Sequence, residues 1–78
     1  MSYRDIAPVT PDDGVNVAQG EFAAIWCAGN AGNIVVTTAA GVDRTLPIAT
    51  GFANRILVRG VRVKATGTTA TTLYVCFL

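Results

Sequence analysis

The side chains that most often carry acid–base or nucleophilic chemistry are scarce in this sequence. It contains no histidine, five acidic residues and two cysteines. Without histidine, the usual Ser-His or Cys-His nucleophile cannot be built, and the commonest zinc ligand is missing. Four of the five acids lie within residues 1–21, so a pair of carboxylates facing each other across an active site is not expected. We therefore predict no catalytic residue, no bound metal and no cofactor.

Two acidic residues do stand side by side, in the motif "PDDG". Asp12 and Asp13 followed by Gly14 resemble the start of a calcium loop, but no Glu closes an EF-hand loop at its twelfth position. Asp and Gly are also typical turn residues, so the motif predicts a tight turn. The Gly-rich stretches "GNAGN" and "ATGTT" predict hairpin turns, because neither opens a helix with the lysine of a phosphate-binding loop.

Four cations crowd one stretch of the chain: Arg55, Arg59, Arg62 and Lys64. Small β-barrels bind single-stranded nucleic acids by combining cations with stacked aromatic rings. Here Trp26, Tyr74 and Phe77 sit among aliphatic residues, where packing in a core is their default role. The formal net charge is only +1, without the excess expected of a nucleic-acid-binding protein. A nucleic-acid partner is therefore a less favoured alternative.

The small net charge conceals an uneven distribution along the chain. Residues 1–21 carry four acids and one arginine (−4 + 1 = −3), whereas residues 22–78 carry five cations and one acid (+5 − 1 = +4). Two interpretations are open. The two regions could simply be solvated surfaces, or an acidic segment of one subunit could lie on a basic face of its neighbour, where complementary charges set register and partner choice.

Length and composition favour a small domain that is completed by assembly. The chain has 78 residues, of which 51% are hydrophobic and 14% charged. A domain of this size buries only roughly 60–65% of its unfolded surface, so such a core is marginal without added support. With so many apolar residues and so little interior, we expect part of the surface to be covered by other chains.

The two cysteines are predicted to be buried free thiols. Cys27 and Cys76 each lie in an apolar run, where a free cysteine behaves as a small hydrophobic residue. The opening "MSYRDIAP" lacks the apolar region of a signal peptide, which predicts synthesis in a reducing cytosol. Whether the two thiols are adjacent is left open. No stretch approaches the roughly 20 apolar residues of a membrane helix, so no membrane is expected as a partner.

The order of elements predicts an all-β fold, a small antiparallel β-sandwich or jelly-roll-like barrel with an extended N-terminal arm. Residues 1–20 form the arm, in which Pro8 and Pro11 disfavour helix and leave room for one short strand, and residues 21–78 form a single β domain. Turn signals recur about every 8–12 residues, as in sandwiches and barrels. The expected strands are 22–28, 34–38, 42–46 (ended by Pro47), 55–65 and 71–78.

The segment 55–65 changes phase at Gly60. Apolar residues occupy the even positions before it and the odd positions after it. A shift of one residue moves every side chain to the other face of a sheet, so an extra residue must be absorbed there. Glycine is suited to a β-bulge, which would leave Arg62 and Lys64 pointing outward. A corner between two sheets is the alternative.

The final stretch is apolar on both of its faces. Leu73, Val75 and Phe77 alternate with Tyr74, Cys76 and Leu78. A strand that is apolar on both sides is one that is buried on both sides. One side would meet the core of the domain, and we expect the other to be covered by the arm, by a neighbouring subunit, or by both.

Three stretches resemble a known family: "IAPVTPDD" (6–13), "AIWCAGNAGNIVVTTAAG" (24–41) and "ILVRGVRVKATGTTATTLYVCFL" (56–78). They are similar to the small head-spike base proteins of tailed phages and phage-derived gene transfer agents of alphaproteobacteria. The resemblance covers most of the chain from Ile6 onward, and "RVKATGTTAT" is its most specific part. The ending "LYVCFL" is longer and more apolar than in the family, and "RTLPIATGFANR" follows the family loop only loosely.

The resemblance implies a non-enzymatic virion protein. Members of the family look like β-sandwich subunits that form a ring, by likeness a pentamer, on capsid vertices and carry a spike or fibre. For this chain it implies assembly in the host cytoplasm and a place on the capsid surface as a head-spike base or decoration subunit. Its partners would be copies of itself, the major capsid protein and a spike or fibre protein. A trimeric cement protein and a tail or baseplate adaptor are the alternatives.

From the charge asymmetry and the two-sided last strand we predict where the contacts with other chains lie. The arm should reach a neighbour or the capsid, the basic segment should lie at a subunit boundary, and assembly should bury residues 73–78. The predicted interface residues are Tyr3, Arg4, Ile6, Val9, Asp12, Asp13, Arg55, Arg59, Arg62, Lys64, Tyr74, Phe77 and Leu78.

Overall fold

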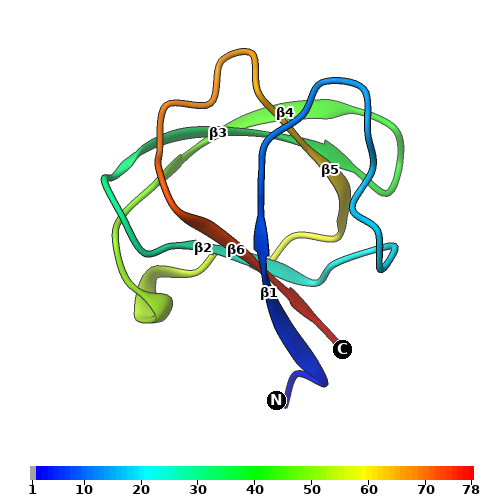
Figure 1. Cartoon of the computed structure of the whole chain (residues 1–78), viewed down its shortest axis with the longest axis horizontal. Helices are drawn as coiled ribbons and strands as arrows, with labels where there is room; N and C mark the ends of the chain where they lie inside the picture. Colours follow the sequence, from blue (N-terminus) through cyan, green and yellow to red (C-terminus); the bar gives the residue numbers. More distant parts are fainter. Residues whose placement is uncertain (1) are drawn as a thin grey trace.

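Six β-strands form two antiparallel three-stranded sheets that enclose the core (Figure 1). The computed structural model describes residues 2–78. One sheet has the order β1-β6-β2 and the other β4-β3-β5. The strands are β1 Asp5–Val9, β2 Ala24–Cys27, β3 Gly32–Thr38, β4 Asp43–Ile48, β5 Gly60–Lys64 and β6 Leu73–Phe77. This confirms the predicted all-β, sandwich-like class.

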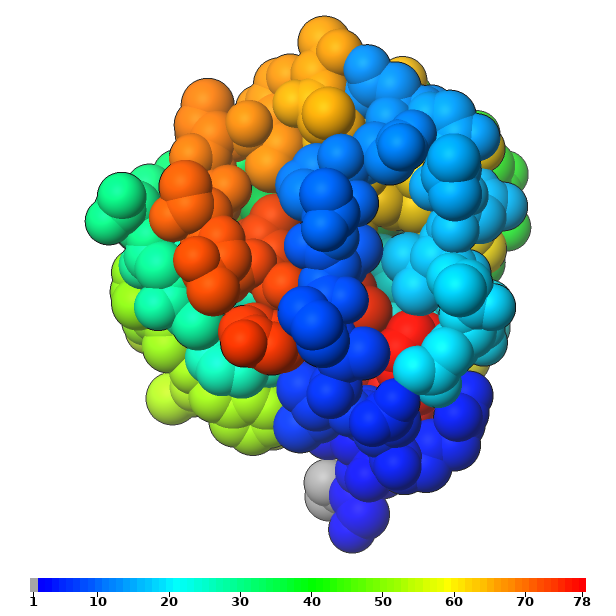
Figure 2. Space-filling view, in the orientation of Figure 1, coloured from blue at the N-terminus to red at the C-terminus, as the bar shows by residue number. Residues whose placement is uncertain are grey.

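The last strand is apolar on both faces because it is the central strand of its sheet. β6 pairs with β1 on one side, where Val75 lies opposite Ala7, and with β2 on the other, where it lies opposite Ile25. The core lies against the side chains at alternate positions of β6, which are Leu73, Val75 and Phe77. Figure 2 shows β1 lying alongside residues 70–78 on the surface. Edge strands from the same chain therefore flank the last strand.

Side chains from both sheets meet in one core. Its largest fully buried members come from β2, β3, β5 and β6, together with Phe22 just before β2, and include no charged group. The β-branched run of β3 supplies Ile34 and Val36, which are both 0% exposed. Opposite them lie Ile25, Val75 and Phe77 of the first sheet, also 0% exposed. Alternation along each strand sends these residues inward and their neighbours outward.

Residues 2–20, the described part of the predicted arm, fold back onto their own chain. β1 is an edge strand of the first sheet, and beyond it the backbone amides of Asp12 and Val17 donate to the carbonyls of Val63 and Val61 at distances of 2.8 Å each. The one short strand expected in the arm is β1, at Asp5–Val9. The arm thus covers the open edge of β5 in its own domain. Contact between the arm and a neighbour remains a prediction.

The expected long strand at 55–65 is wrong, because only its second half is a strand. Ile56 forms an isolated bridge with Ile25 of the first sheet, whereas β5 begins at Gly60 in the second sheet. The segment therefore crosses between sheets, as the corner alternative proposed. The bulge is present too: pairing jumps from Thr37–Arg62 to Thr38–Gly60, which leaves Val61 as the extra residue.

Gly60 permits this corner because it has no side chain. A Cβ atom there would lie 2.4 Å from Cζ of Phe22 and 2.8 Å from Cγ1 of Val36. Phe22 and Gly60 also exchange two backbone hydrogen bonds, of 2.8 and 3.1 Å. The aromatic ring thus occupies the space that a side chain would need, which is the close approach that a strand glycine often marks.

Two further expectations are corrected. Pro47 does not end its strand, since β4 continues to Ile48; proline is tolerated there because β4 is an edge strand whose outward amide needs no partner. The loop before residue 55 contains one turn of 3₁₀ helix, η1, at Phe52–Asn54. Within residues 2–78, no helix is long and apolar enough to cross a membrane.

The chain itself buries most of the last strand, so assembly is not needed for it. Leu73 is 3% exposed, and Val75, Cys76 and Phe77 are 0% exposed. Phe77 therefore has no free surface for a partner, contrary to its place among the predicted interface residues. The reason is that β1 and β2 flank the strand while the second sheet covers its inner face. Leu78 alone in this stretch is largely exposed, at 46%.

Candidate interaction surface

The outward side of the sheet β1-β6-β2 is apolar, although it faces away from the core. The strand register places Ile6 beside Cys76, and Trp26 beside Tyr74. Side chains directly opposite each other in an antiparallel pair share one face. We call this the outer apolar face and define it by Tyr3, Ile6, Pro8, Trp26, Phe52, Arg55, Leu57, Tyr74 and Leu78.

Aromatic rings form the middle of the outer apolar face. The rings of Trp26 and Tyr74 stack with centroids 4.9 Å apart and an interplanar angle of 18°. Phe52 of η1 meets Trp26 edge-on at 5.5 Å, and Tyr3 meets Phe52 edge-on at 6.3 Å. Such pairs add about 0.5–1.5 kcal/mol each beyond area burial. The cluster therefore fixes the residues before β1 and the η1 turn against the sheet.

Arg55 is the cation of this surface. Its guanidinium carbon lies 4.7 Å from the Phe52 ring centroid, Nε donates to the Tyr3 hydroxyl at 3.2 Å, and Nη1 donates to the Phe52 carbonyl at 3.3 Å. A guanidinium has five N–H donors, so these two bonds leave further donors free. Beneath it lies Cys76, where burial raises the pKa of the thiol and the charge of Arg55 offsets part of that rise.

Several large apolar side chains of this face are open to solvent. The exposed fractions are 44% for Ile6, 37% for Phe52, 68% for Leu57 and 46% for Leu78. Leu57 follows Ile56, which packs against the core, so Leu57 points the other way. Leu57 and Leu78 border a hollow of about 220 Å³. Contiguous exposed apolar groups of this kind mark interaction sites in soluble proteins.

One buried donor in the aromatic cluster has no acceptor. Nε1 of Trp26 is inaccessible and makes no hydrogen bond. Leaving such a donor unpaired costs about 1–3 kcal/mol, and each case in a native protein calls for an explanation. The aromatic packing of Trp26 against Tyr74 and Phe52 offsets this cost. Packing, rather than hydrogen bonding, thus holds the indole at this position.

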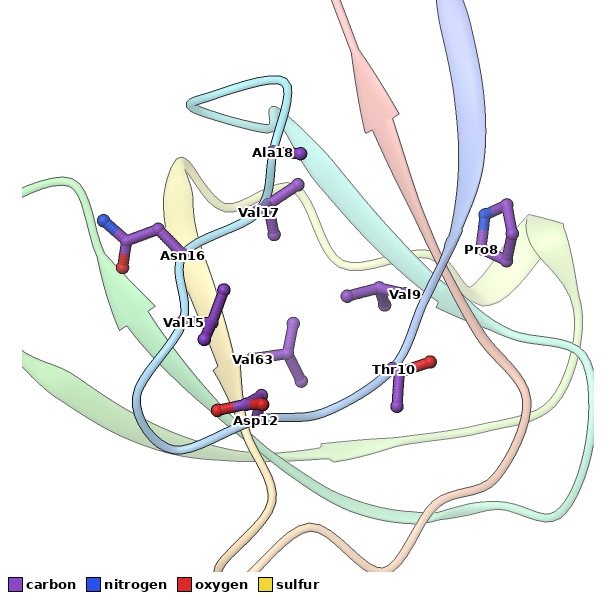
Figure 3. Close-up of a pocket in the computed structure, with 9 residues that line it drawn as sticks. All are labelled: Pro8, Val9, Thr10, Asp12, Val15, Asn16, Val17, Ala18 and Val63. Atoms are coloured by element: carbon purple, nitrogen blue, oxygen red, sulfur yellow. The ribbon is translucent and has the colours of Figure 1, made fainter.

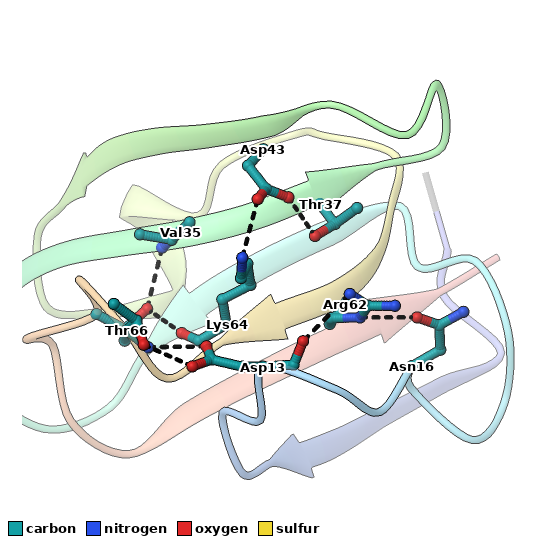
Figure 4. A network of polar contacts seen from close by, with 9 residues as sticks. Asp13, Asn16, Val35, Thr37, Asp43, Arg62, Lys64 and Thr66 are labelled. Carbon is teal, nitrogen blue, oxygen red and sulfur yellow. Dashed lines mark hydrogen bonds and ion pairs between the residues drawn. The ribbon is translucent and has the colours of Figure 1, made fainter.

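The outward side of the other sheet, β4-β3-β5, is polar by contrast (Figure 4). The Thr37 hydroxyl donates to Asp43 at 2.6 Å, and Lys64 forms an ion pair with the same carboxylate at 3.0 Å. These bonds, with Thr37 the larger contributor, lower the pKa of Asp43. Both cations of β5 lie on this side, as predicted, since Arg62 donates to Asn16 at 2.9 Å.

Asp13 ties the "PDDG" turn to the loop that follows β5. Its carboxylate accepts from the backbone amide of Thr66 at 2.9 Å and from the hydroxyl of the same residue. These bonds lower the pKa of Asp13. The backbone carbonyl of Asp13 accepts a further hydrogen bond from Nη1 of Arg62 at 3.2 Å. The turn predicted from Asp12 and Gly14 is present, because the Asp12 carboxylate accepts from the Gly14 amide at 2.8 Å.

A second hollow, of about 250 Å³, lies between β1 and the segment that covers β5 (Figure 3). Val9, Val17 and Val63 line its inner wall, and Asp12 and Val15 lie on its rim. Val15 is 64% exposed. The hollow is the open seam between the two sheets, and its lining offers no cluster of chemically reactive groups.

The structure separates the basic residues that the sequence placed together. Arg55 lies on the outer apolar face, Arg59 pairs with Glu21 at 3.2 Å, and Arg62 and Lys64 lie on the opposite sheet. The crossing of segment 55–60 between sheets is the cause. Acids and cations that were expected to meet between subunits thus partly meet within one chain. Contacts of the predicted interface residues with another chain remain a prediction.

Arg4 joins the two ends of the described chain. Its Nε donates to the carbonyl of Leu78 at 2.8 Å, its guanidinium lies 5.5 Å from the Phe77 ring centroid, and Nη1 donates to Gln19 at 3.2 Å. Gln19 in turn donates to Asp5 at 2.7 Å. This network anchors the residues before β1 to β6.

Sequence reasoning missed three contributors to the outer apolar face. Phe52 lies in a stretch predicted only as a loop, and Trp26 was assigned to the core. Leu57 was placed in a continuous strand, but it lies between Ile56 and Val58, which both pack against the core. This alternation of neighbouring residues was the available sequence signal that Leu57 points away from the core. Within residues 2–78, no cluster of three or more His, Cys, Asp or Glu side chains could hold a metal ion.

The fold is similar to that of a chain in a solved structure described as "Capsid of native GTA particle computed with C5 symmetry", a gene transfer agent particle. The sequences are 29% identical, the similarity covers 96% of this chain and 83% of the other, and the TM-score is 0.81. No family model matches the sequence. No curated protein matches it either.

Proposed function

We propose that this protein is a non-enzymatic structural subunit of a tailed-phage or gene transfer agent particle, located on the capsid surface. The observation that carries the proposal is the similarity to a chain of a gene transfer agent capsid over 96% of the present sequence, at 29% identity and a TM-score of 0.81. A likeness of that extent involves the whole domain, including the segment before β2, rather than a shared sheet motif.

Within the particle, we assign it the role of a head-spike base or decoration subunit that forms a homo-oligomer, with a pentamer favoured. The fivefold symmetry in the description of the similar capsid supports this choice. The outer apolar face supports assembly, because it leaves Leu57, Leu78 and Ile6 substantially exposed in the single chain. The partners would be copies of itself, the major capsid protein and a spike or fibre protein.

Electron cryomicroscopy of purified particles tests this role. The expected result is density for this chain on fivefold vertices. Density on threefold positions would instead assign it as a trimeric cement protein, and density on the tail as an adaptor. Absence of the chain from purified particles, judged by mass spectrometry of their proteins, would refute the proposal as a whole.

A further inference from the structure

Two unlike surfaces of this chain complement each other in charge and shape. The first is the outer apolar face, with Arg55 as its cation. The second is the "PDDG" turn with the two residues after it, Pro11–Asn16, which we call the acidic loop. We infer that the acidic loop of one copy docks on the outer apolar face of the next copy. The inference rests on the proposed homo-oligomer and specifies which surfaces build it.

The charges match, and neither is neutralised within the chain. Among residues 2–78, Asp12 has no ion-pair partner, and no carboxylate pairs with Arg55. One carboxylate oxygen of Asp12 is held by the Gly14 amide at 2.8 Å, which fixes the group while the other oxygen stays open. Arg55 keeps unused N–H donors beyond its bonds to Tyr3 and Phe52. A charge-assisted hydrogen bond between copies would use both.

The apolar groups match as well. Val15 on the acidic loop is 64% exposed, and the hollow of about 220 Å³ beside Leu57 and Leu78 has room for a valine side chain. Leu57 lies two positions after Arg55, a span of about 7 Å in extended chain. Val15 lies three positions after Asp12, so the two residues can be at most about 10 Å apart along the chain. One docked loop can therefore reach the cation and the hollow together.

The positions of the two surfaces determine the kind of contact. In Figure 1 the acidic loop, which follows β1, lies at the upper right, whereas η1, β2 and the C-terminal end of β6 lie toward the lower side. The part of the outer apolar face formed by η1 and the C-terminal end of β6 thus lies away from the acidic loop, and a contact between that part and the loop of another copy joins copies head to tail. Head-to-tail contacts generate rings when the rotation closes. This agrees with a cyclic oligomer rather than with a two-fold dimer.

Analytical ultracentrifugation of the full chain over a range of concentrations tests the inference. The wild type should self-associate. Leu57→Asp should weaken association at least tenfold, the loss expected when an exposed anchor residue is removed from a small interface. Val42→Asp is the matched control, because Val42 is 41% exposed in the turn between β3 and β4 and lies outside both surfaces. It should associate like the wild type.

Reversing the two charges supplies an independent test of the same contact. Asp12→Arg and Arg55→Glu should each weaken association, and an equimolar mixture of the two variants should associate more strongly than either variant alone, since each contact between unlike variants joins opposite charges. Recovery should be partial in a five-membered ring, where at least one contact joins two copies of the same variant. Arg44→Glu, an exposed β4 cation, is the control and should behave like the wild type. Because Arg55 also packs on Phe52, circular dichroism should verify each fold; Leu57→Asp, whose side chain is mostly in solvent, tests the inference even if Arg55→Glu misfolds.

A wild type that stays monomeric at all concentrations would overturn the inference, as would a Leu57→Asp variant that associates like the wild type. So would a mixture of the two folded charge variants that associates no more strongly than either variant alone. These results leave the proposed place on the particle intact if particles still carry the protein, since docking on the capsid could hold it there without this contact. Conversely, absence from particles combined with association through these surfaces would refute the function and retain the contact.

Discussion

Gly60→Ala tests the corner that joins the two sheets. The added Cβ would lie 2.4 Å from Cζ of Phe22, 2.9 Å from its Cε1, and 2.8 Å from Cγ1 of Val36. Phe22 and Val36 are both 0% exposed, so neither borders solvent into which it could move. The two backbone hydrogen bonds between Phe22 and Gly60 further hold the two segments together. The substitution must therefore displace the core or open the corner.

Overpacking of a well-packed core costs about 1–3 kcal/mol, and the lower entropy of the unfolded alanine chain offsets about 0.4–1 kcal/mol of this. The net loss should be roughly 1–2 kcal/mol. In a domain of this size each kcal/mol shifts Tm by about 4–8 °C, so Gly60→Ala should melt roughly 4–16 °C below the wild type. Calorimetry or thermal circular dichroism at one fixed protein concentration measures this, because association would otherwise move Tm.

Gly14→Ala is the matched control for the same chemical change. A Cβ at Gly14 would meet only the Asp12 carboxylate, at an ordinary 3.8 Å. It should leave Tm unchanged or raise it slightly. In a Phe22→Leu background, where the aromatic ring is gone, Gly60→Ala should cost clearly less than in the wild type. A Gly60→Ala protein that melts together with the wild type would refute the close contact between Phe22 and Gly60.

Three further expectations follow from single sites. Thr72 is a β-branched residue with φ +57°, so Thr72→Asn, which tolerates that backbone, should raise Tm by a few degrees in calorimetry; an unchanged or lower Tm would contradict the strain. Thr37 and Lys64 lower the pKa of Asp43 in the folded chain below its ordinary value of 3.8. The charged Asp43 carboxylate therefore stabilises the fold fully above pH 3.8, and this stabilisation is lost as the pH falls through the lower pKa of the folded state. Asp43→Asn should therefore flatten the acid-side fall of the urea midpoint, and an equally steep fall would argue against the prediction. Cys27 and Cys76 are both 0% exposed free thiols, so a thiol reagent should modify neither in native buffer and both in denaturant, whereas fast native labelling would show that the cover over them opens readily.

The strands with the clearest local signals were predictable. The β-branched run at 34–38 became the middle of the second sheet. The hairpin turns predicted from "GNAGN" and "ATGTT" are wrong, because each stretch connects strands of different sheets: β2 to β3 and β5 to β6. The phase change at Gly60 was visible as well, because a strand alternates with a period of two and any break in that period must be absorbed. What the alternation could not tell was that the chain also changes sheets there.

The candidate interaction surface was only partly visible in the sequence. Tyr3, Ile6, Arg55, Tyr74 and Leu78 were among the predicted interface residues and do lie on the outer apolar face. Trp26, Phe52 and Leu57 were not, because aromatic and aliphatic residues in apolar runs are by default assigned to a core. Only the strand register, which sets Trp26 beside Tyr74, reveals which apolar residues point away from it.

The sequence by itself determined the all-β class, the lack of histidine chemistry and the two-sided apolar character of residues 73–78, because these follow from residue type and period alone. The tertiary structure decided what covers that last strand. It placed β6 between β1 and β2, so a strand that looked as if it needed a neighbouring subunit is mostly buried by its own chain. It also separated Cys27, which faces the core, from Cys76, which faces outward. Pairing between distant segments makes these choices, and no local pattern encodes it.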